Sequence, residues 1–161
     1  MRILAIDPGT TESAWVLYDP EAHRVMCHGI EPNGEVLNHA RCGYADILAV
    51  EMVQSFGMPV GAEVFETVLW TGRFVEAWGG PWRKIYRKDV KLHLCQSLRA
   101  KDPNIRQAIL DRFPRTGGGK TPQVGTKAEP GPLYGCRSHI WSALAVAITA
   151  AETSEHKKEG H

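Results

Sequence analysis

The chain has 161 residues, 43% of them hydrophobic and 23% charged, and a formal net charge of +1 at pH 7. This length and composition predict one globular domain that is long enough to bury a core. The apolar runs are far shorter than the ~18 residues that span a bilayer, and no signal-peptide pattern is present, so we expect neither a membrane segment nor a leader.

The first half of the chain predicts strands and one short helix. Apolar, β-rich runs at residues 2–6, 13–19 and 23–30 are separated by short turns, which is typical of consecutive antiparallel strands. Residues 33–43 predict a short helix with Asn33 as its cap and Gly43 at its end. The apolar run at residues 46–53 predicts a fourth strand that carries one acid, Glu51.

The second half alternates between helix and strand. Residues 62–78 predict a helix whose apolar side chains lie roughly on one face, namely Val64, Phe65, Val68, Leu69, Val75 and Trp78. Residues 82–86 predict a fifth strand, and residues 88–98 and 103–113 two helices, the second with Asp102 as cap and Pro103 in its first position. Residues 138–151 predict an apolar closing helix capped by Ser138, and residues 152–161 a polar tail.

Three consecutive strands followed by alternating strands and helices predict an α/β fold with a mixed five-stranded sheet and helices on both faces. Residues 114–135, rich in Gly, Pro and Lys, predict a long flexible basic loop. From Arg83 to Lys127, 12 Lys or Arg stand against 3 Asp, whereas the other residues are net acidic. This imbalance is typical of a surface that binds polyanions, and a solvated helix face is an equal alternative.

Two acids end apolar strands. Asp7 follows the first strand, and Glu51 lies near the end of the fourth. If these strands are neighbours, both carboxylates meet at one sheet edge, where open α/β sheets bind ligands. Two buried carboxylates repel each other unless a cation neutralises them, so the pair favours a hard divalent metal; for either acid alone, an exposed or salt-bridged strand end is the alternative. For His139 alone, a structural or solvated histidine is the alternative; it becomes a third ligand if the closing helix begins at the same edge.

Two other motifs carry no site. The four cysteines, which include no C-x-x-C pair, favour free thiols over a zinc or redox site: Cys27, Cys42, Cys95 and Cys136. The "GGGKT" at residues 117–121 is not a P-loop, because the position that requires the first Gly holds Pro114 and no strand precedes it.

Four segments occur in an informative order: "ILAIDPGTT", "LAVEMV", "YRKDVKLHLCQSLRAKDPNIRQAIL" and "HIWSALAVAITA". Together they resemble the RuvC family of Holliday-junction resolvases within the RNase H-like fold, and more narrowly the short RuvC-like proteins of phages and prophages. The first two resemble the strands with the catalytic Asp and Glu. The third resembles the segment whose lysines approach the DNA backbone, and the fourth resembles the closing helix. The resemblance implies one RuvC-like nuclease domain over residues 1–151.

The resemblance implies a metal-dependent endonuclease that hydrolyses phosphodiester bonds in branched DNA such as Holliday junctions. Asp7, Glu51 and His139 match metal ligands, and Ser142 stands where the family has an acidic fourth ligand. Two Mg²⁺ or Mn²⁺ ions about 4 Å apart would activate water, polarise the phosphate and relieve charge on the leaving oxygen. A neutral imidazole among the ligands favours Mn²⁺ over Mg²⁺.

Basic residues are expected to hold the DNA. Lys91 and Lys101 match phosphate contacts of the family, and a nearby lysine would stabilise charge in the transition state. The family can carry an aromatic residue where this chain has Gln54, and Phe56 is the nearest substitute. The complete set of expected DNA-binding residues is Arg83, Lys84, Arg87, Lys88, Lys91, Arg99, Lys101, Arg106, Lys120, Lys127 and Phe56.

The resemblance also implies a homodimer, since two coordinated cuts in a junction need two sites, in the cytoplasm of a bacterium or a phage-infected cell. Trp70 and Phe74 widen the apolar face of the helix at residues 62–78 and suggest the dimer contact, although a wide core contact is an equal alternative.

Two alternative functions remain. With Ser142 in place of an acid, the chain is also compatible with a catalytically weak RuvC-like protein that binds DNA junctions. The segment "DPGTTES" is similar to the first phosphate loop of actin-like ATP-binding proteins, but those need two such domains and a second Gly-rich loop. Cleavage of a labelled four-way junction and calorimetry with ATP separate the three readings.

Overall fold

The computed structural model describes residues 1–155. Its elements follow in the order β1 (Ile3–Asp7), β2 (Glu12–Asp19), β3 (Arg24–Pro32), α1 (Asn33–Arg41), β4 (Ile47–Met52), α2 (Ala62–Trp78), β5 (Trp82–Tyr86), α3 (Arg87–Cys95), α4 (Asp102–Leu110) and α5 (Ile140–Glu155). Each helix and strand expected from the sequence is present, with differences of a few residues at several ends. No helix within the described residues is both long and apolar enough to cross a membrane.

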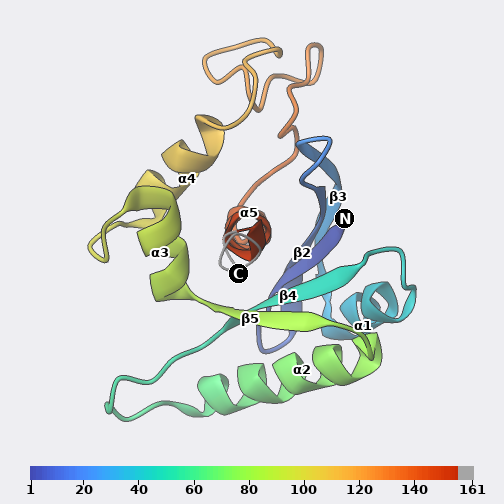
Figure 1. Cartoon of the computed structure of the whole chain (residues 1–161), viewed down its shortest axis with the longest axis vertical. Helices are drawn as coiled ribbons and strands as arrows, with labels where there is room; N and C mark the ends of the chain where they lie inside the picture. Colours follow the sequence, from blue (N-terminus) through green and yellow to red (C-terminus); the bar gives the residue numbers. More distant parts are fainter. Residues whose placement is uncertain (156–161) are drawn as a thin grey trace.

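The five strands form one mixed sheet in the order β3-β2-β1-β4-β5. The strands β1, β2 and β3 pair antiparallel, whereas β4 and β5 run parallel to β1. The carboxyl ends of β1, β4 and β5 therefore meet at one edge of the sheet, as Figure 1 shows. This arrangement confirms the predicted α/β fold and the expected neighbourhood of the first and fourth strands.

Helices cover both faces of the sheet because successive side chains of a strand point to opposite faces. In β1, Ile3 and Ala5 pack on the side of α5, with α3 and α4 beyond it, whereas Leu4 and Ile6 pack toward α1 and α2. All four side chains are 0% exposed, and burying an Ile or Leu side chain stabilises the fold by roughly 1.5–3 kcal/mol. The helix α5 lies across the middle of the sheet and is buried almost all round.

The helix α2 turns a different face to the core than the sequence predicts. Phe65 and Leu69 are 66% and 58% exposed, whereas Thr67, Thr71 and Phe74 are buried. The two threonine hydroxyls donate to carbonyl oxygens one turn earlier in the helix, at 2.9 and 2.8 Å. Because these hydroxyls are satisfied inside the helix, polar residues can face the core, and the expected apolar face was wrong on this point.

The three expected helix caps are displaced. Asn33 and Asp102 are the first residues of α1 and α4 rather than the residues before them. Ser138 has a φ of 48° and lies two residues before the start of α5. The side chains of Asn33 and Asp102 instead make longer-range contacts near Asp7 and Glu51, which are described below.

The loop at residues 114–135 contains no helix or named strand, but it folds back on itself through backbone hydrogen bonds. The N–H of Gly117 donates to the carbonyl of Pro122, and that of Leu133 to the carbonyl of Gln123, both at 2.8 Å. The buried Gln123 amide donates to the carbonyl of Leu110 at 3.1 Å, which ties the loop to the end of α4. The flexibility of this loop stays a prediction.

Candidate active site

Asp7 and Glu51 lie side by side where β1 and β4 end. The parallel register pairs Ile6 with Val50, so the two acids occupy the next position of adjacent strands. Their side chains are only 14% and 16% exposed, and the charge of Asp7 raises the pKa of Glu51. The sequence predicted this pair from one acid at the end of each apolar run.

Both carboxyl groups resist ionisation while no cation is bound. Burial, reinforced by the negative charge of Asp7, raises the pKa of Glu51 to about 8. Burial also raises the pKa of Asp7, although His139, the hydrogen bond from Glu51 and Arg87 act in the opposite direction. A pair of buried carboxyl groups whose pKa values are both raised is a site that gains free energy when a hard cation binds.

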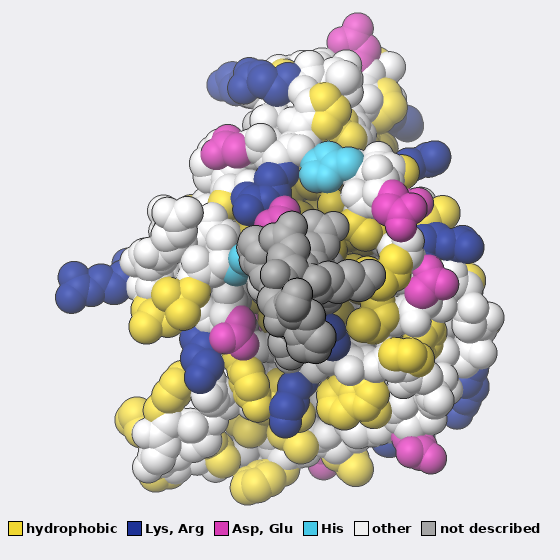
Figure 2. Space-filling view, in the orientation of Figure 1, with side chains coloured by type: hydrophobic (Ala, Val, Ile, Leu, Met, Phe, Trp, Pro, Cys, Tyr) yellow, Lys and Arg dark blue, Asp and Glu magenta, His cyan; other side chains and the backbone are white. Residues whose placement is uncertain are grey.

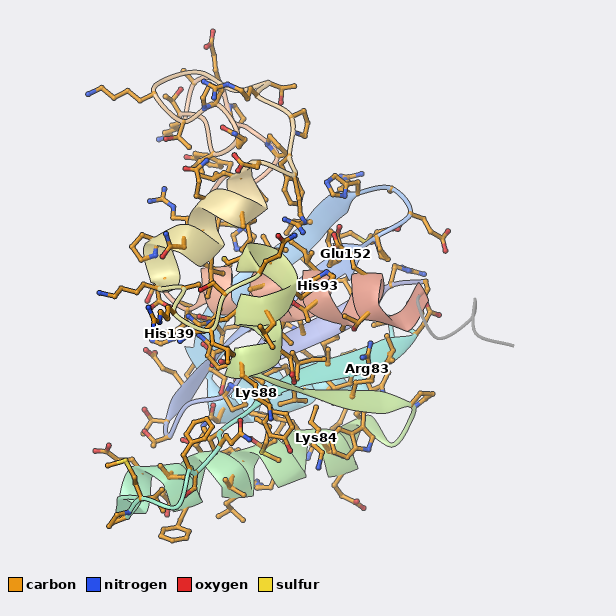
Figure 3. The ribbon with its side chains drawn as sticks, turned by 60° about the vertical axis from the view of Figure 1, so that its left-hand side comes forward. Arg83, Lys84, Lys88, His93, His139 and Glu152 are labelled. Atoms are coloured by element: carbon orange, nitrogen blue, oxygen red, sulfur yellow. The ribbon has the colours of Figure 1, made fainter. Side chains whose placement is uncertain are left out.

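His139 joins the pair through Asp7. Its Nδ1 lies 2.9 Å from Oδ2 of Asp7, and its side chain is 73% exposed. Figure 3 shows it at the end of α5 opposite Glu152. Within residues 1–155, no three or more His, Cys, Asp or Glu side chains are arranged to hold a metal ion. The expected role of His139 as a third ligand therefore stays a prediction.

Two cavities meet at Arg87. One, of about 320 Å³, is lined by Asp7, Glu51, Gln54, Phe56, Arg87 and Lys88, among others. The other, of about 590 Å³, lies between α3, α4 and α5, and its lining includes Arg87, Asp102, Arg106, Trp141 and Ser142. Ser142, expected as a weak fourth ligand, thus lies in the neighbouring cavity, and the lining of the cavity that holds Asp7 and Glu51 does not include it.

Arg87 links the two cavities by two ionic contacts. Its Nη1 lies 4.0 Å from Oε1 of Glu51, and its Nη2 pairs with Oδ1 of Asp102. The sequence predicted Arg87 only as a DNA contact and Asp102 only as a helix cap. The available signal was the position of Arg87 directly after β5, because the residue that follows a parallel strand lies at the same sheet edge as Asp7 and Glu51.

The turn that follows Asp7 is held by a buried hydrogen-bond network. Ser13 accepts from the N–H of Gly9 at 3.1 Å and donates to the side chain of Asn33. The amide of Asn33, only 2% exposed, donates in turn to the carbonyl of Gly9 at 3.0 Å. A Cβ on Gly9 would lie 2.2 Å from the carbonyl oxygen of Glu12, so this close turn requires glycine. The network fixes the chain that leaves Asp7.

A third cavity, of about 420 Å³, opens on the other side of Asp7. It is lined mainly by this turn and by the residues before α5, including Thr10, Thr11, Arg137 and His139. Arg137 lies outside the basic segment that the sequence singled out, and it was missed for that reason. It adds a positive side chain beside His139.

The predicted basic residues are spread over several surfaces. Lys88 lines the cavity of Asp7 and Glu51, and the guanidinium of Arg106 lies 5.0 Å from the ring centre of Trp141 in the neighbouring cavity. Phe56 is 76% exposed at the first of these cavities. The remaining basic residues toward α3, α4 and the long loop are the half-buried Lys91 and the exposed Arg99, Lys101, Lys120 and Lys127.

Arg83 and Lys84 lie away from these cavities. Arg83 donates to the carbonyl of Ala150 and to the hydroxyl of Thr153, near the end of α5 that is far from His139. Figure 3 shows both basic residues on β5, well separated from His139. The structure does not bring this part of the predicted DNA-binding set to Asp7 and Glu51.

Comparison with known proteins identifies the fold. No protein-family model and no curated protein matches the sequence. The structure is similar to a Thermus thermophilus RuvC structure, with a TM-score of 0.69 and 18% identity over 98% of this chain and 97% of that chain. It is also similar to T. thermophilus RuvC in complex with Holliday junction substrate, with a TM-score of 0.69 and 19% identity over 98% and 96% of the two chains. The chain therefore has a RuvC-like fold, as the four sequence segments implied.

Proposed function

We propose that the protein is a divalent-metal-dependent endonuclease that hydrolyses phosphodiester bonds in branched DNA such as Holliday junctions. One observation carries the proposal: two nearly buried carboxyl groups, Asp7 and Glu51, end adjacent parallel strands of a RuvC-like fold. One solved structure of this fold holds a Holliday junction substrate, which supports branched DNA as the substrate class.

The residues present suit a hard divalent cation. Asp7 and Glu51 offer carboxylate oxygens, the ligands that Mg²⁺ and Mn²⁺ prefer, and burial raises the pKa values of both groups, which a bound cation would lower again. His139, held next to Asp7, would add an imidazole that favours Mn²⁺. When bound, such an ion supplies an activated water and a polarised phosphate.

The side chains around the pair would bind and orient the DNA. Lys88 and Arg87 line the cavity that holds the two acids, where they can bind phosphate oxygens. The exposed ring of Phe56 offers a surface on which an unpaired base can stack. Lys91 and Lys101 would follow the backbone beyond this cavity, and such phosphate contacts give affinity that depends on salt and little on sequence.

We also infer that the protein acts as a homodimer, which would present two sites to a junction. Support comes from the outward face of α2, where Phe65, Val68 and Leu69 are exposed. Figure 2 shows hydrophobic side chains gathered along the lower edge of the molecule, where Figure 1 places α2. Trp70 and Phe74, which the sequence suggested as the dimer contact, do not form this face, because Phe74 is fully buried and Trp70 partly buried. Light scattering at micromolar concentration should give twice the chain mass, and Leu69→Lys should give the monomer mass; a monomeric wild type contradicts the inference.

The central test is Asp7→Asn, which removes a charge with little change of shape. Cleavage of a labelled four-way junction with Mn²⁺ or Mg²⁺ should slow by at least about 100-fold, which corresponds to ~2.7 kcal/mol of transition-state stabilisation. Junction binding in a mobility-shift assay should stay within about threefold of wild type. A panel of forks, flaps and plain duplex measures the structural preference. If Asp7→Asn cuts at the wild-type rate, the proposed site is wrong.

A second candidate function is supported by the position of Ser142, which supplies no carboxylate and lies outside the cavity of the two acids. In this case the chain would bind junctions without cutting them efficiently. The same assays separate the two functions: a wild type that shifts the four-way junction but leaves every strand intact with both metals is a binding protein.

A further inference from the structure

We propose that the guanidinium of Arg87 is a built-in cation of the site that takes the place of a second divalent ion. Each site would then bind one metal ion at Asp7 and Glu51, and Arg87 would contact the phosphate that is cut. The inference rests on the proposed nuclease function, and it replaces the two-ion site expected from the family resemblance.

The fold places Arg87 at the same edge of the sheet as Asp7 and Glu51. It is the first residue of α3 and directly follows β5, whose last residue, Tyr86, pairs with Met52 of β4. Arg87 therefore leaves the sheet at the same edge as Glu51, and its Nη1 lies 4.0 Å from Oε1 of that residue. Its side chain is 30% exposed, so the charge lies partly inside the molecule and remains reachable by a ligand.

The surroundings of Arg87 on the side of α5 favour an anion over a second cation. From α5, Trp141 and Ser142 line this cavity and neither carries a charge, whereas Arg106 of α4 brings a second guanidinium. The acid in the lining of this cavity is Asp102, which is 84% exposed and already paired with Arg87. A divalent ion here would face two positive charges and one shared carboxylate, whereas a phosphate would face two guanidinium groups.

Asp102 acts as a positioning residue for Arg87. It lies at the first position of α4, where Pro103 follows and restricts the backbone, and it pairs with Nη2 of the guanidinium. This contact leaves Nη1 directed toward Glu51. A guanidinium held in this way is preorganised for phosphate, because its planar fork of N–H donors matches two phosphate oxygens.

Hydrolysis of the phosphodiester bond requires only water as a second reactant. Hydrolysis forms one bond from the water oxygen to phosphorus and breaks the bond from phosphorus to the leaving sugar oxygen. The water loses a proton and the leaving oxygen gains one, and nothing is oxidised or reduced. Negative charge grows on the phosphate oxygens in between, and a fixed guanidinium stabilises that charge.

The first measurement is the metal stoichiometry, which does not depend on activity. Calorimetric titration of the metal-free full-length protein with MnCl₂ should give one ion per chain for wild type and none for Asp7→Asn. The double variant Arg87→Gln/Ser142→Asp, which removes the fixed cation and adds a carboxylate, should take up two. Two ions of similar affinity in the wild type overturn the inference but leave the nuclease proposal intact. Unchanged Mn²⁺ binding by Asp7→Asn overturns both.

The second measurement is cleavage at saturating Mn²⁺. Arg87→Gln should slow the cutting step by 100- to 1,000-fold, as for the loss of one preorganised donor, while junction binding changes less than about threefold. The matched control Arg41→Gln, exposed at the end of α1, should cut at the wild-type rate. If Arg87→Gln does not fold by circular dichroism, Asp102→Asn serves instead, with one ion per chain and roughly tenfold slower cleavage. Wild-type rates in the folded variant would mean that Arg87 does not act on the phosphate that is cut, and would overturn the inference.

Discussion

The burial of Glu51 beside Asp7 should make the stability of the metal-free protein depend on pH. Burial and the charge of Asp7 raise the pKa of Glu51 to about 8 in the folded chain, from its ordinary value of 4.5. A group with a raised folded pKa holds its proton more tightly when folded, so stability is full below about pH 4.5 and decreases as pH rises toward 8. At about 1.4 kcal/mol per pH unit, this interval sets an upper limit of roughly 5 kcal/mol for the loss.

The variant Glu51→Gln keeps the shape of the side chain and cannot ionise. In EDTA, urea unfolding should show it to be roughly 2–4 kcal/mol more stable than wild type at pH 9 and equal within about 1 kcal/mol at pH 5. The control Glu63→Gln, at an exposed position of α2, should follow wild type at both values. Mn²⁺ at 100 times its dissociation constant should stabilise wild type by about 2.7 kcal/mol and the variant by less. If the difference between wild type and Glu51→Gln is the same at pH 5 and pH 9, the reasoning about this carboxyl pair is refuted.

Three further outcomes are expected. Asn33→Ala removes the buried amide that holds the turn after Asp7, and urea unfolding should show a loss of roughly 1–3 kcal/mol together with slower junction cleavage; unchanged values would contradict the network's role. His139→Ala should lose most cleavage with either metal while circular dichroism stays unchanged, and normal cutting would separate this residue from the site. Partial burial alone would raise the pKa of Glu152, but hydrogen bonds from Arg112 and His93 lower it, so the stability this group contributes at neutral pH is lost as pH falls through its lowered pKa. Glu152→Gln should therefore cost at most about 1 kcal/mol at pH 7, because the group is half-exposed, and less as pH falls and the carboxyl becomes protonated. A cost in urea titrations that does not change with pH would argue against a role of the charge.

The sequence predicted the sheet and its acidic edge because both depend on local patterns. A buried β-strand consists mainly of apolar residues. The apolar runs of β1 and β4 each carry one acid near their end, and this exception marked Asp7 and Glu51 as candidate site residues. Whether these strands are neighbours stayed a condition of the sequence analysis, and the structure pairs them in parallel. The position of each acid in its strand was thus predictable, and the strand pairing then brings the two residues together.

The contacts missed from the sequence depend on side chains that are far apart in the chain. Arg87 and Asp102 lie on different helices, and their ion pair depends on how α3 packs against α4, for which a basic segment gives no signal. The core-facing threonines of α2 were missed because their hydroxyls are satisfied by the helix itself, so polarity alone misidentified the buried face. Asn33 is of a residue type that often caps helices, but its side-chain amide donates to the carbonyl of Gly9, more than twenty residues earlier in the chain.

The central place of α5 has a consequence for the order in which the molecule matures. This helix is the last described element, yet it covers β1, β2 and β4, and His139 immediately precedes it. On a ribosome, the strands with Asp7 and Glu51 emerge long before the segment that covers Ile3, Ala5 and Val16. Until α5 docks, this face of the sheet has no apolar partner, and His139 does not lie beside Asp7. Assembly of the proposed site with its histidine is thus expected to be a late event of synthesis.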